Sequence, residues 1–376
     1  MNRKTKRQSA GAVAVVMLVA GGWALRVARA QSGGIKTAEQ QFKNIQVLKG
    51  VPADQLFPTM QFISISLGVE CEFCHVEGAF EKDDKKSKQT ARNMMRMMFA
   101  INKDNFEGHR EVTCHSCHRG ATAPVGTPII SALEPKEEPG EMRKGGVVQA
   151  KLPSAANIFD NYLKALGGVA VLDKITSRVQ KGKINFNGGE FAIDVFARDG
   201  GKRISLMHIQ DGDSVTAYNG HEGWLSAPGR PVREMHGSDL DAAAMDADLH
   251  FATHLKQMFS ETGVEQGEKI GDHETYLVMG RREGNTPLNL YFDEQSGLLL
   301  RLVRFGETAL GRLPTQIDYS DYREADGVKV PFRWTLARAN GRFSVQVSEM
   351  KQNVAVDDAK FVKPADPAPD GHRPGH

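Results

Sequence analysis

The sequence predicts a chain of two parts, a mainly α-helical N-terminal domain followed by an α+β domain built on an antiparallel sheet. Apolar residues recur at helical spacing up to about residue 130. From Ser154 to about Phe361, short alternating runs are separated by Asn-Gly and Asp-Gly pairs, which are typical of hairpins. Between these parts, residues 131–153 are rich in Pro, Gly and Glu with little periodicity, which indicates a linker.

Three helices are expected in the first domain, which we place at residues 34–130. The apolar spacing predicts them over residues 37–48, 52–67 and 88–102, with Gly50 and Gly68 ending the first two. The charged stretch at residues 81–86 is expected to form a solvated loop. On the third helix one face is predicted to carry Met94, Met97, Met98 and Ile101, with the opposite face carrying Arg92, Asn93 and Arg96.

The second domain is placed at residues 154–362, with a disordered tail at 363–376. Ser154 is expected to cap a helix that runs through Leu166 and ends at Gly167-Gly168. A further helix is predicted at about residues 239–259. The strand signals cover Lys183–Asn187, Phe191–Ala197, Tyr276–Gly280, Leu288–Phe292, Leu298–Phe305, Gln316–Tyr322 and Phe343–Met350.

The N-terminus has the pattern of a secretory signal peptide over residues 1–30. A basic start is followed by an apolar stretch and an A-x-A cleavage site, Ala28-Arg29-Ala30. The segment holds six of the 48 basic residues and none of the 46 acidic ones, so the mature chain has 42 basic residues and a formal charge of −4. This mildly acidic balance argues against nucleic acid as a partner. The prediction is a periplasmic protein, membrane-associated only if the segment is not cleaved.

All four cysteines belong to two C-x-x-C-H segments, at residues 71–75 and 114–118. This pattern is typical of c-type haem attachment, in which the thiols add to porphyrin vinyl groups and the histidine binds iron. A four-cysteine zinc site is the first alternative, but its pairs are usually only about 15–20 residues apart. Two disulfides are the second, with poor geometry at this separation. The sequence predicts two covalently attached haems, held by Cys71, Cys74, Cys114 and Cys117, with His75 and His118 as iron ligands.

The sixth ligand of each iron is not set by these motifs. The first domain contains five methionines, and a methionine ligand raises the haem potential. A methionine-rich core stripe is the alternative interpretation, because methionine fills irregular gaps. Periodicity alone does not choose among the four on the third helix. The five are Met60, Met94, Met95, Met97 and Met98.

Three stretches of the first domain resemble the cytochrome c subunit of photosynthetic reaction centres. They are VLKGVPADQLFPTMQFISISLGVECEFCH, RNMMRMMFAIN and VTCHSCHRG, and the resemblance covers about residues 43–125. In that family each haem unit is a ligand-bearing helix, a turn and C-x-x-C-H, and four units form two pairs. The resemblance implies one pair here, with Met60 as sixth ligand of the first haem and Met94, or in its place Met97, for the second.

This chain departs from the family in lacking the other pair. Tetrahaem members use a histidine before a C-x-x-C-H segment to ligate a haem of that other pair. His109 occupies a comparable place, five residues before Cys114. It is either a surface histidine or a ligand to a haem of this or a second molecule. His115, inside the second motif, is expected at the surface.

The second domain resembles the periplasmic outer-membrane lipoprotein carrier and sorting family. The sequence cues are ALGG, NGHEGW, YFDEQSGLLLR and DYSDYREADGVKVPF. The resemblance implies an open half-barrel of antiparallel strands whose concave face is plugged by helices. Such a face would receive an acyl chain, a lipoprotein tail or a quinone-like molecule, or else be closed by its own helix and serve for docking.

The leading hypothesis is a periplasmic dihaem cytochrome that passes single electrons to or from a redox partner. A membrane-bound reaction centre and a respiratory complex are both compatible as partners. One alternative is a haem-dependent redox enzyme, a peroxidase or a quinol-oxidising module, which needs a vacant or displaceable sixth site. Another is a lipid or lipoprotein binder whose haem domain senses redox state. No catalytic residues are predicted.

Overall fold

The chain forms a helical region and a β region, as predicted. The computed structural model describes residues 36–124, 152–186, 188–339 and 341–365. The expected signal peptide, nearly all of the linker and the tail beyond residue 365 lie outside these residues. No helix among the described residues has the length and apolar character needed to cross a membrane.

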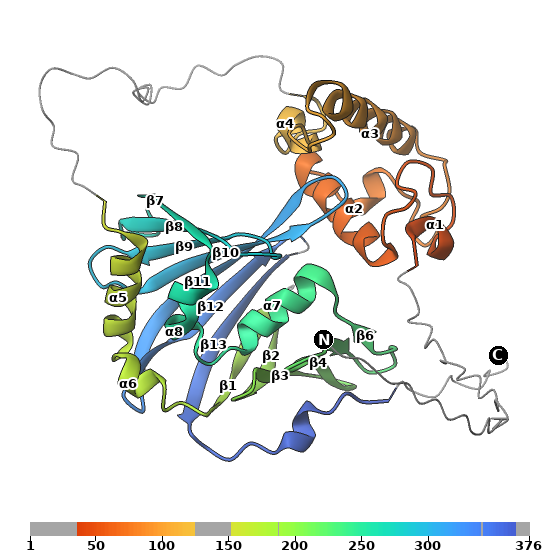
Figure 1. Cartoon of the computed structure of the whole chain (residues 1–376). Helices are drawn as coiled ribbons and strands as arrows, with labels where there is room; N and C mark the ends of the chain where they lie inside the picture. The colour runs from red at the N-terminus through yellow and green to blue at the C-terminus, as the bar shows by residue number, and fades with distance from the viewer. Residues whose placement is uncertain (1–35, 125–151, 187, 340, 366–376) are drawn as a thin grey trace, which may run out of the picture.

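The helical region contains three short and two long helical segments (Figure 1). The two long helices are close to the predicted spans. The first of them, Ala53–Leu67, ends at Gly68, whose left-handed φ of 65° stops the helix. In order they are α1 Ala38–Gln41, α2 Ala53–Leu67, the 3-10 helix η1 Cys71–Phe73, α3 Lys86–Asn105 and α4 Cys114–His118.

The predicted helix over residues 37–48 is wrong beyond Gln41. Phe42 is extended, and Asn44 has a left-handed φ of 58°. The Asn44 side chain donates to the Glu81 carbonyl at 2.5 Å and to Asp83 Oδ1 at 2.9 Å. Bonds to a loop nearly forty residues away therefore replace the helical turns that the local apolar spacing predicts.

The β region is one open sheet of thirteen antiparallel strands with helices on one face (Figure 1). Two meanders, β1 to β6 and β7 to β13, join where β1 pairs with β13. The strands are β1 Ser177–Phe186, β2 Gly189–Arg198, β3 Lys202–Ile209, β4 Gly212–Asn219, β5 Gly223–Ser226, β6 Arg233–Glu234, β7 Glu261–Gln266, β8 Thr275–Arg281, β9 Leu288–Asp293, β10 Leu299–Glu307, β11 Arg312–Ala325, β12 Val328–Arg338 and β13 Gly341–Gln352.

The helices of the β region cover its concave face. Ser154 caps the first one as predicted, since its Oγ accepts from the Asn157 N–H at 3.2 Å. The predicted helix at 239–259 is interrupted at Asp248, whose carboxylate accepts from the His250 N–H at 2.9 Å. The α-helices on this face are α5 Ala155–Leu166, α6 Val169–Leu172, α7 Gly237–Ala247 and α8 Phe251–Met258, whereas the 3-10 helix η2 Asp358–Phe361 packs on the opposite face, against β3 and β4.

The turn between β10 and β11 connects the two regions. Leu310 at its tip is fully buried in the core of the helical region, against Phe62 and Leu48. The next residue has no room for a side chain, because a Cβ on Gly311 would lie 2.4 Å from the Phe62 ring. In Figure 1 this turn reaches α2 from the sheet. The core of the helical region is therefore completed by a residue of the β region.

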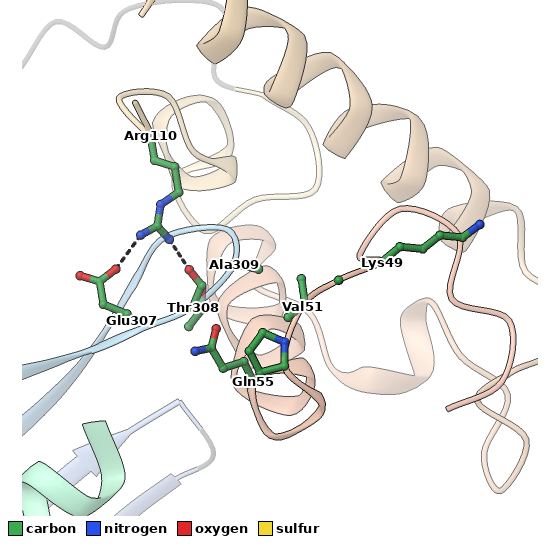
Figure 2. A pocket seen from close by; sticks show the side chains of 9 residues that line it. Lys49, Val51, Gln55, Arg110, Glu307, Thr308 and Ala309 are labelled. Carbon is green, nitrogen blue, oxygen red and sulfur yellow. Dashed lines mark hydrogen bonds and ion pairs between the residues drawn. The ribbon is translucent and has the colours of Figure 1, made fainter. Parts of the chain in front are cut away.

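Polar contacts bond the three residues before Leu310 to the helical region. Figure 2 shows Arg110 donating to Glu307 and to the Thr308 carbonyl, and the Arg110–Glu307 pair measures 2.7 Å. The Ala309 N–H donates to Thr59 Oγ1 at 3.3 Å. A pocket of about 610 Å³ lies beside these contacts. Together they fix the hairpin tip on α2.

We expect Leu310→Ala to lower the free energy of unfolding of the helical region by about 2–5 kcal/mol, because it leaves a cavity in that core. Native-state hydrogen exchange of α2 amides measures this loss. Leu255→Ala is the control, since Leu255 in α8 is equally buried but belongs to the core of the β region. Unchanged protection of α2 in Leu310→Ala would contradict the prediction.

Candidate functional site

The first C-x-x-C-H segment lies directly after α2 and is bonded to the first turn of α3. Cys71 lies in η1, and the Cys74 N–H closes that turn on the Cys71 carbonyl. From α3, Ser87 Oγ donates to the Phe73 carbonyl, and just before it Lys85 Nζ donates to the Glu72 carbonyl. These two bonds fix the backbone of the motif through side chains that lie outside it, so the backbone conformation of the motif does not depend on its own residues alone.

The residues just before the second segment are bonded to the other end of the same helix. Asn102 of α3 is buried, and its side chain pairs with Val112 in both directions, at 2.7 Å to the carbonyl and 2.9 Å from the N–H. Thr113 then caps α4, with its N–H donating to Ser116 Oγ at 3.0 Å. The helix α3 is therefore hydrogen-bonded to the first motif at its start and to the residues before the second motif near its end.

The end of α2 also packs against the second motif. The Gly120 N–H donates to the Ser66 carbonyl at 2.9 Å. A Cβ on Gly68 would lie 2.2 Å from the Gly120 carbonyl oxygen, so only glycine allows this approach. The chain at or beside each motif is thus joined to both long helices, α2 and α3.

The two motif histidines are oriented in the same way. His75 Nδ1 lies 2.9 Å from the Phe80 carbonyl oxygen, and His118 Nδ1 lies 2.9 Å from the Ala121 carbonyl oxygen. A carbonyl oxygen only accepts, so Nδ1 carries the proton in each ring and the Nε2 lone pair is left for a metal. Iron-binding histidines are held by this kind of outer bond. The residues therefore fit a haem iron at both motifs.

The four cysteines form no disulfides, and their side chains differ in exposure. Cys71 and Cys117 are exposed, whereas Cys74 and Cys114 are half-buried. Burial raises the pKa of the Cys74 and Cys114 thiols. Each motif thus has one exposed and one half-buried cysteine.

The methionines of α3 divide into two buried and two exposed side chains. Met95 and Met98 are 7% and 5% exposed and pack into the core around Leu310. Met94 and Met97 are 38% and 49% exposed. The predicted face is therefore wrong for Met98, which belongs to the core. Two methionines of this helix face outward, where a planar group could contact them.

Arg92 also lies on a different side of α3 from the one predicted. It is 5% exposed and bonds to Asp83 at 2.9 Å and to the Asn44 carbonyl at 3.2 Å. Beside it, Lys88 pairs with the same carboxylate at 3.1 Å. The loop at residues 81–86, expected to be solvated, is thus bonded to α3. The partners are too distant in sequence for a local pattern to reveal the network.

Exposed apolar side chains gather in the helical region. Most of the large exposed hydrophobic residues of the described chain belong to it. Covering such side chains with a porphyrin would remove them from water, which agrees with the histidine geometry. They are Phe42, Phe57, Ile65, Phe73, Phe80, Met94, Met97, Phe99 and Phe106.

Met60 lies on α2 and is half-buried at the edge of the core around Leu310. Its side chain is therefore partly packed against that core and partly exposed. His109 and His115 are both exposed. The structure thus places all eight predicted haem residues in the helical region, while His109 stands in the loop before the second motif.

The concave face of the sheet is filled by its own helices. Phe159 and Tyr162 of α5 pack edge-on against Phe292, and Leu255 of α8 is fully buried in the same core. Two arginines lie beneath α7, where Arg304 pairs with Asp246 at 2.8 Å and Arg282 is bonded to Asp241 by both nitrogens. The sequence did not predict these buried pairs.

The family comparison matches the helical region. Residues 18–179 match the family model of the photosynthetic reaction centre cytochrome c subunit. Cytochrome c-554 of Chloroflexus aurantiacus is 38% identical over 102 residues, 24% of each chain. The photosynthetic reaction center cytochrome c subunit of Thermochromatium tepidum is 35% identical over 100 residues, 25% of this chain and 24% of that one. This region is therefore similar to the cytochrome c subunit of photosynthetic reaction centres, and the predicted resemblance is confirmed.

The matches extend over about a quarter of the length of these curated relatives. For the β region, a LolA superfamily protein from Nitrosomonas europaea is 14% identical with a TM-score of 0.38, covering 56% of this chain and 99% of that one. A likeness of this degree carries no functional argument. The open antiparallel sheet follows from the strand pairing itself.

Two glycines of this site form a matched pair for a test of packing. Gly68 and Gly120 both have left-handed φ, of 65° and 85°, so alanine strains each backbone by roughly 1–2 kcal/mol. Only at Gly68 does the new Cβ meet another atom. We expect Gly68→Ala to lower the free energy of unfolding of the helical region well beyond the loss in Gly120→Ala, measured by denaturant titration. Equal losses would contradict the close approach.

Proposed function

We propose that this chain is a periplasmic dihaem c-type cytochrome that transfers single electrons to or from a membrane-bound redox partner. The observation that carries the proposal is the shared histidine geometry, with Nδ1 bonded to a carbonyl and Nε2 left for iron at both motifs. When bound, each haem supplies one-electron redox chemistry. The chain itself orients the ligands, covers the porphyrin with apolar side chains and holds the two motifs on α3.

The proposed ligands are His75 and Met60 for the first haem, and His118 and Met94 for the second. The exposure of Met94 supports this choice over the buried Met98, and Met97 is the alternative. Two filled axial positions leave no open site for substrate. Electron transfer is therefore favoured over peroxidase or quinol-oxidising chemistry.

For the β region we propose a docking role. The apolar concave face is occupied by α5 and α8, so the filled core supports a scaffold more than an acyl-chain or quinone-like site. The hairpin tip at Leu310 holds this scaffold to the cytochrome. A lipid or quinone that copurifies with the full chain and is lost in a chain lacking residues 153–376 would favour apolar-ligand binding instead.

The proposal predicts two haems per chain, both low-spin, measured by pyridine haemochrome stoichiometry and by magnetic circular dichroism. Met60→Ala and Met94→Ala should each convert one haem to high spin, because each removes one axial ligand. Met98→Ala is the control. It opens a core cavity costing about 2–5 kcal/mol but should leave both spin states unchanged.

Two outcomes would contradict the assignment. If neither Met60→Ala nor Met94→Ala changes a spin state, the ligands are wrong, and Met97→Ala tests the alternative. If the unaltered protein contains a high-spin haem that binds carbon monoxide or peroxide, the chain has an open site and the redox-enzyme hypothesis replaces the carrier.

A further inference from the structure

The two motif histidines differ in what else bonds to their carbonyl partners. The Phe80 carbonyl oxygen accepts from His75 Nδ1 at 2.9 Å and also from Lys88 Nζ at 2.9 Å. For the Ala121 carbonyl, which accepts from His118, no side-chain cation is recorded among the described residues. The first histidine is thus linked through one oxygen atom to a lysine, and the second is not.

The Lys88 ammonium is a fixed and largely dehydrated charge. Its side chain is 10% exposed, and its three N–H groups have three acceptors. These are the Phe80 carbonyl at 2.9 Å, the Lys82 carbonyl at 2.6 Å and Asp83 Oδ1 at 3.1 Å. All three belong to the loop between His75 and α3, so the lysine lies at the centre of the loop that orients the histidine.

The surroundings leave this charge incompletely neutralised. Asp83 is shared between Lys88 and Arg92, and both cations are buried. The Arg92 guanidinium holds the pKa of Asp83 well below its usual range, so the carboxylate stays ionised. One carboxylate therefore pairs with two buried cations, and within the described residues no ion pair to either cation is recorded from Glu81 or Asp84, the other two carboxylates of the loop.

We propose that Lys88 is a positioning residue that raises the reduction potential of the first haem, an inference that depends on the proposed dihaem function. Two physical effects act in the same direction. A buried positive charge favours the state that has gained an electron, because charges interact strongly where water is excluded. The lysine also competes for the Phe80 oxygen, so His75 N–H is polarised less and its imidazole donates less electron density to ferric iron.

The test is potentiometric titration of the full-length holoprotein and four variants. Lys88→Met should lower the midpoint potential of the first haem, with an effect on the order of tenfold in the reduction equilibrium. That is about 59 mV for a one-electron couple. The second haem should keep its potential and serves as the internal control. The wave of the first haem is identified as the one that changes in Met60→Ala.

Two further variants separate charge from structure. Asp83→Asn keeps a hydrogen-bond acceptor but removes the compensating negative charge, so the potential of the first haem should rise. Lys86→Met removes an exposed lysine two residues earlier and should have little effect, since exposed charges are screened. Opposite shifts from Lys88→Met and Asp83→Asn are not expected from loosening of the loop alone.

The outcomes distinguish the two proposals. If two haems are present and Lys88→Met and Asp83→Asn shift the first potential in the same direction or not at all, the role of Lys88 is overturned while the dihaem function stands. If the unaltered protein lacks a haem at the first motif, the proposed function itself fails. If Lys88→Met does not attach its first haem, the Asp83→Asn shift alone decides, and a fall or no change overturns the inference.

Discussion

The helix α3 is the element on which the arrangement of the site depends. Its first turn bonds to the first motif through Ser87 and to the loop after that motif through Lys88, and Asn102 near its other end bonds to the segment before the second motif. The fourteen residue steps from Lys88 to Asn102 correspond to about 21 Å along a helix axis. A helix transmits that spacing rigidly, whereas loops of this length would not. A carrier with two redox groups needs such a fixed separation.

The β region contributes to the same site through packing. Leu310 fills the core that Met95 and Met98 line from α3 and Phe62 lines from α2. Since Met60 lies at the edge of this core, the hairpin tip supports the helix that carries a proposed iron ligand. The cytochrome-like part is thus completed by the sheet. Movement of the sheet relative to α2 would act on Leu310 and would thereby connect the proposed docking role to the helix that carries Met60.

The sequence predicted the elements whose cause is local. The Ser154 cap and the stop at Gly68 each depend on a few neighbouring residues, and these predictions agree with the structure. The wrong predictions depend on distant partners. Asn44 is not helical because its side chain bonds to the Glu81 carbonyl, and Arg92 is buried because it bonds to Asp83. Periodicity treats an arginine as a solvent-facing residue, and nothing in the local pattern reveals the carboxylate that lets it be buried.

The same limit applies to the two motifs themselves. Their five-residue patterns are alike, so they predict the same ligand chemistry, and the histidine geometry agrees at 2.9 Å in each case. The difference arises one bond further out, where a lysine thirteen residues after His75 folds back onto its carbonyl partner. A haem-binding motif therefore determines which atoms approach the iron, while the loop and helix that follow it determine the charge those atoms experience. In a protein with two such motifs, the residues that bond to the carbonyl partner of each histidine are where the two proposed haem sites can differ in reduction potential.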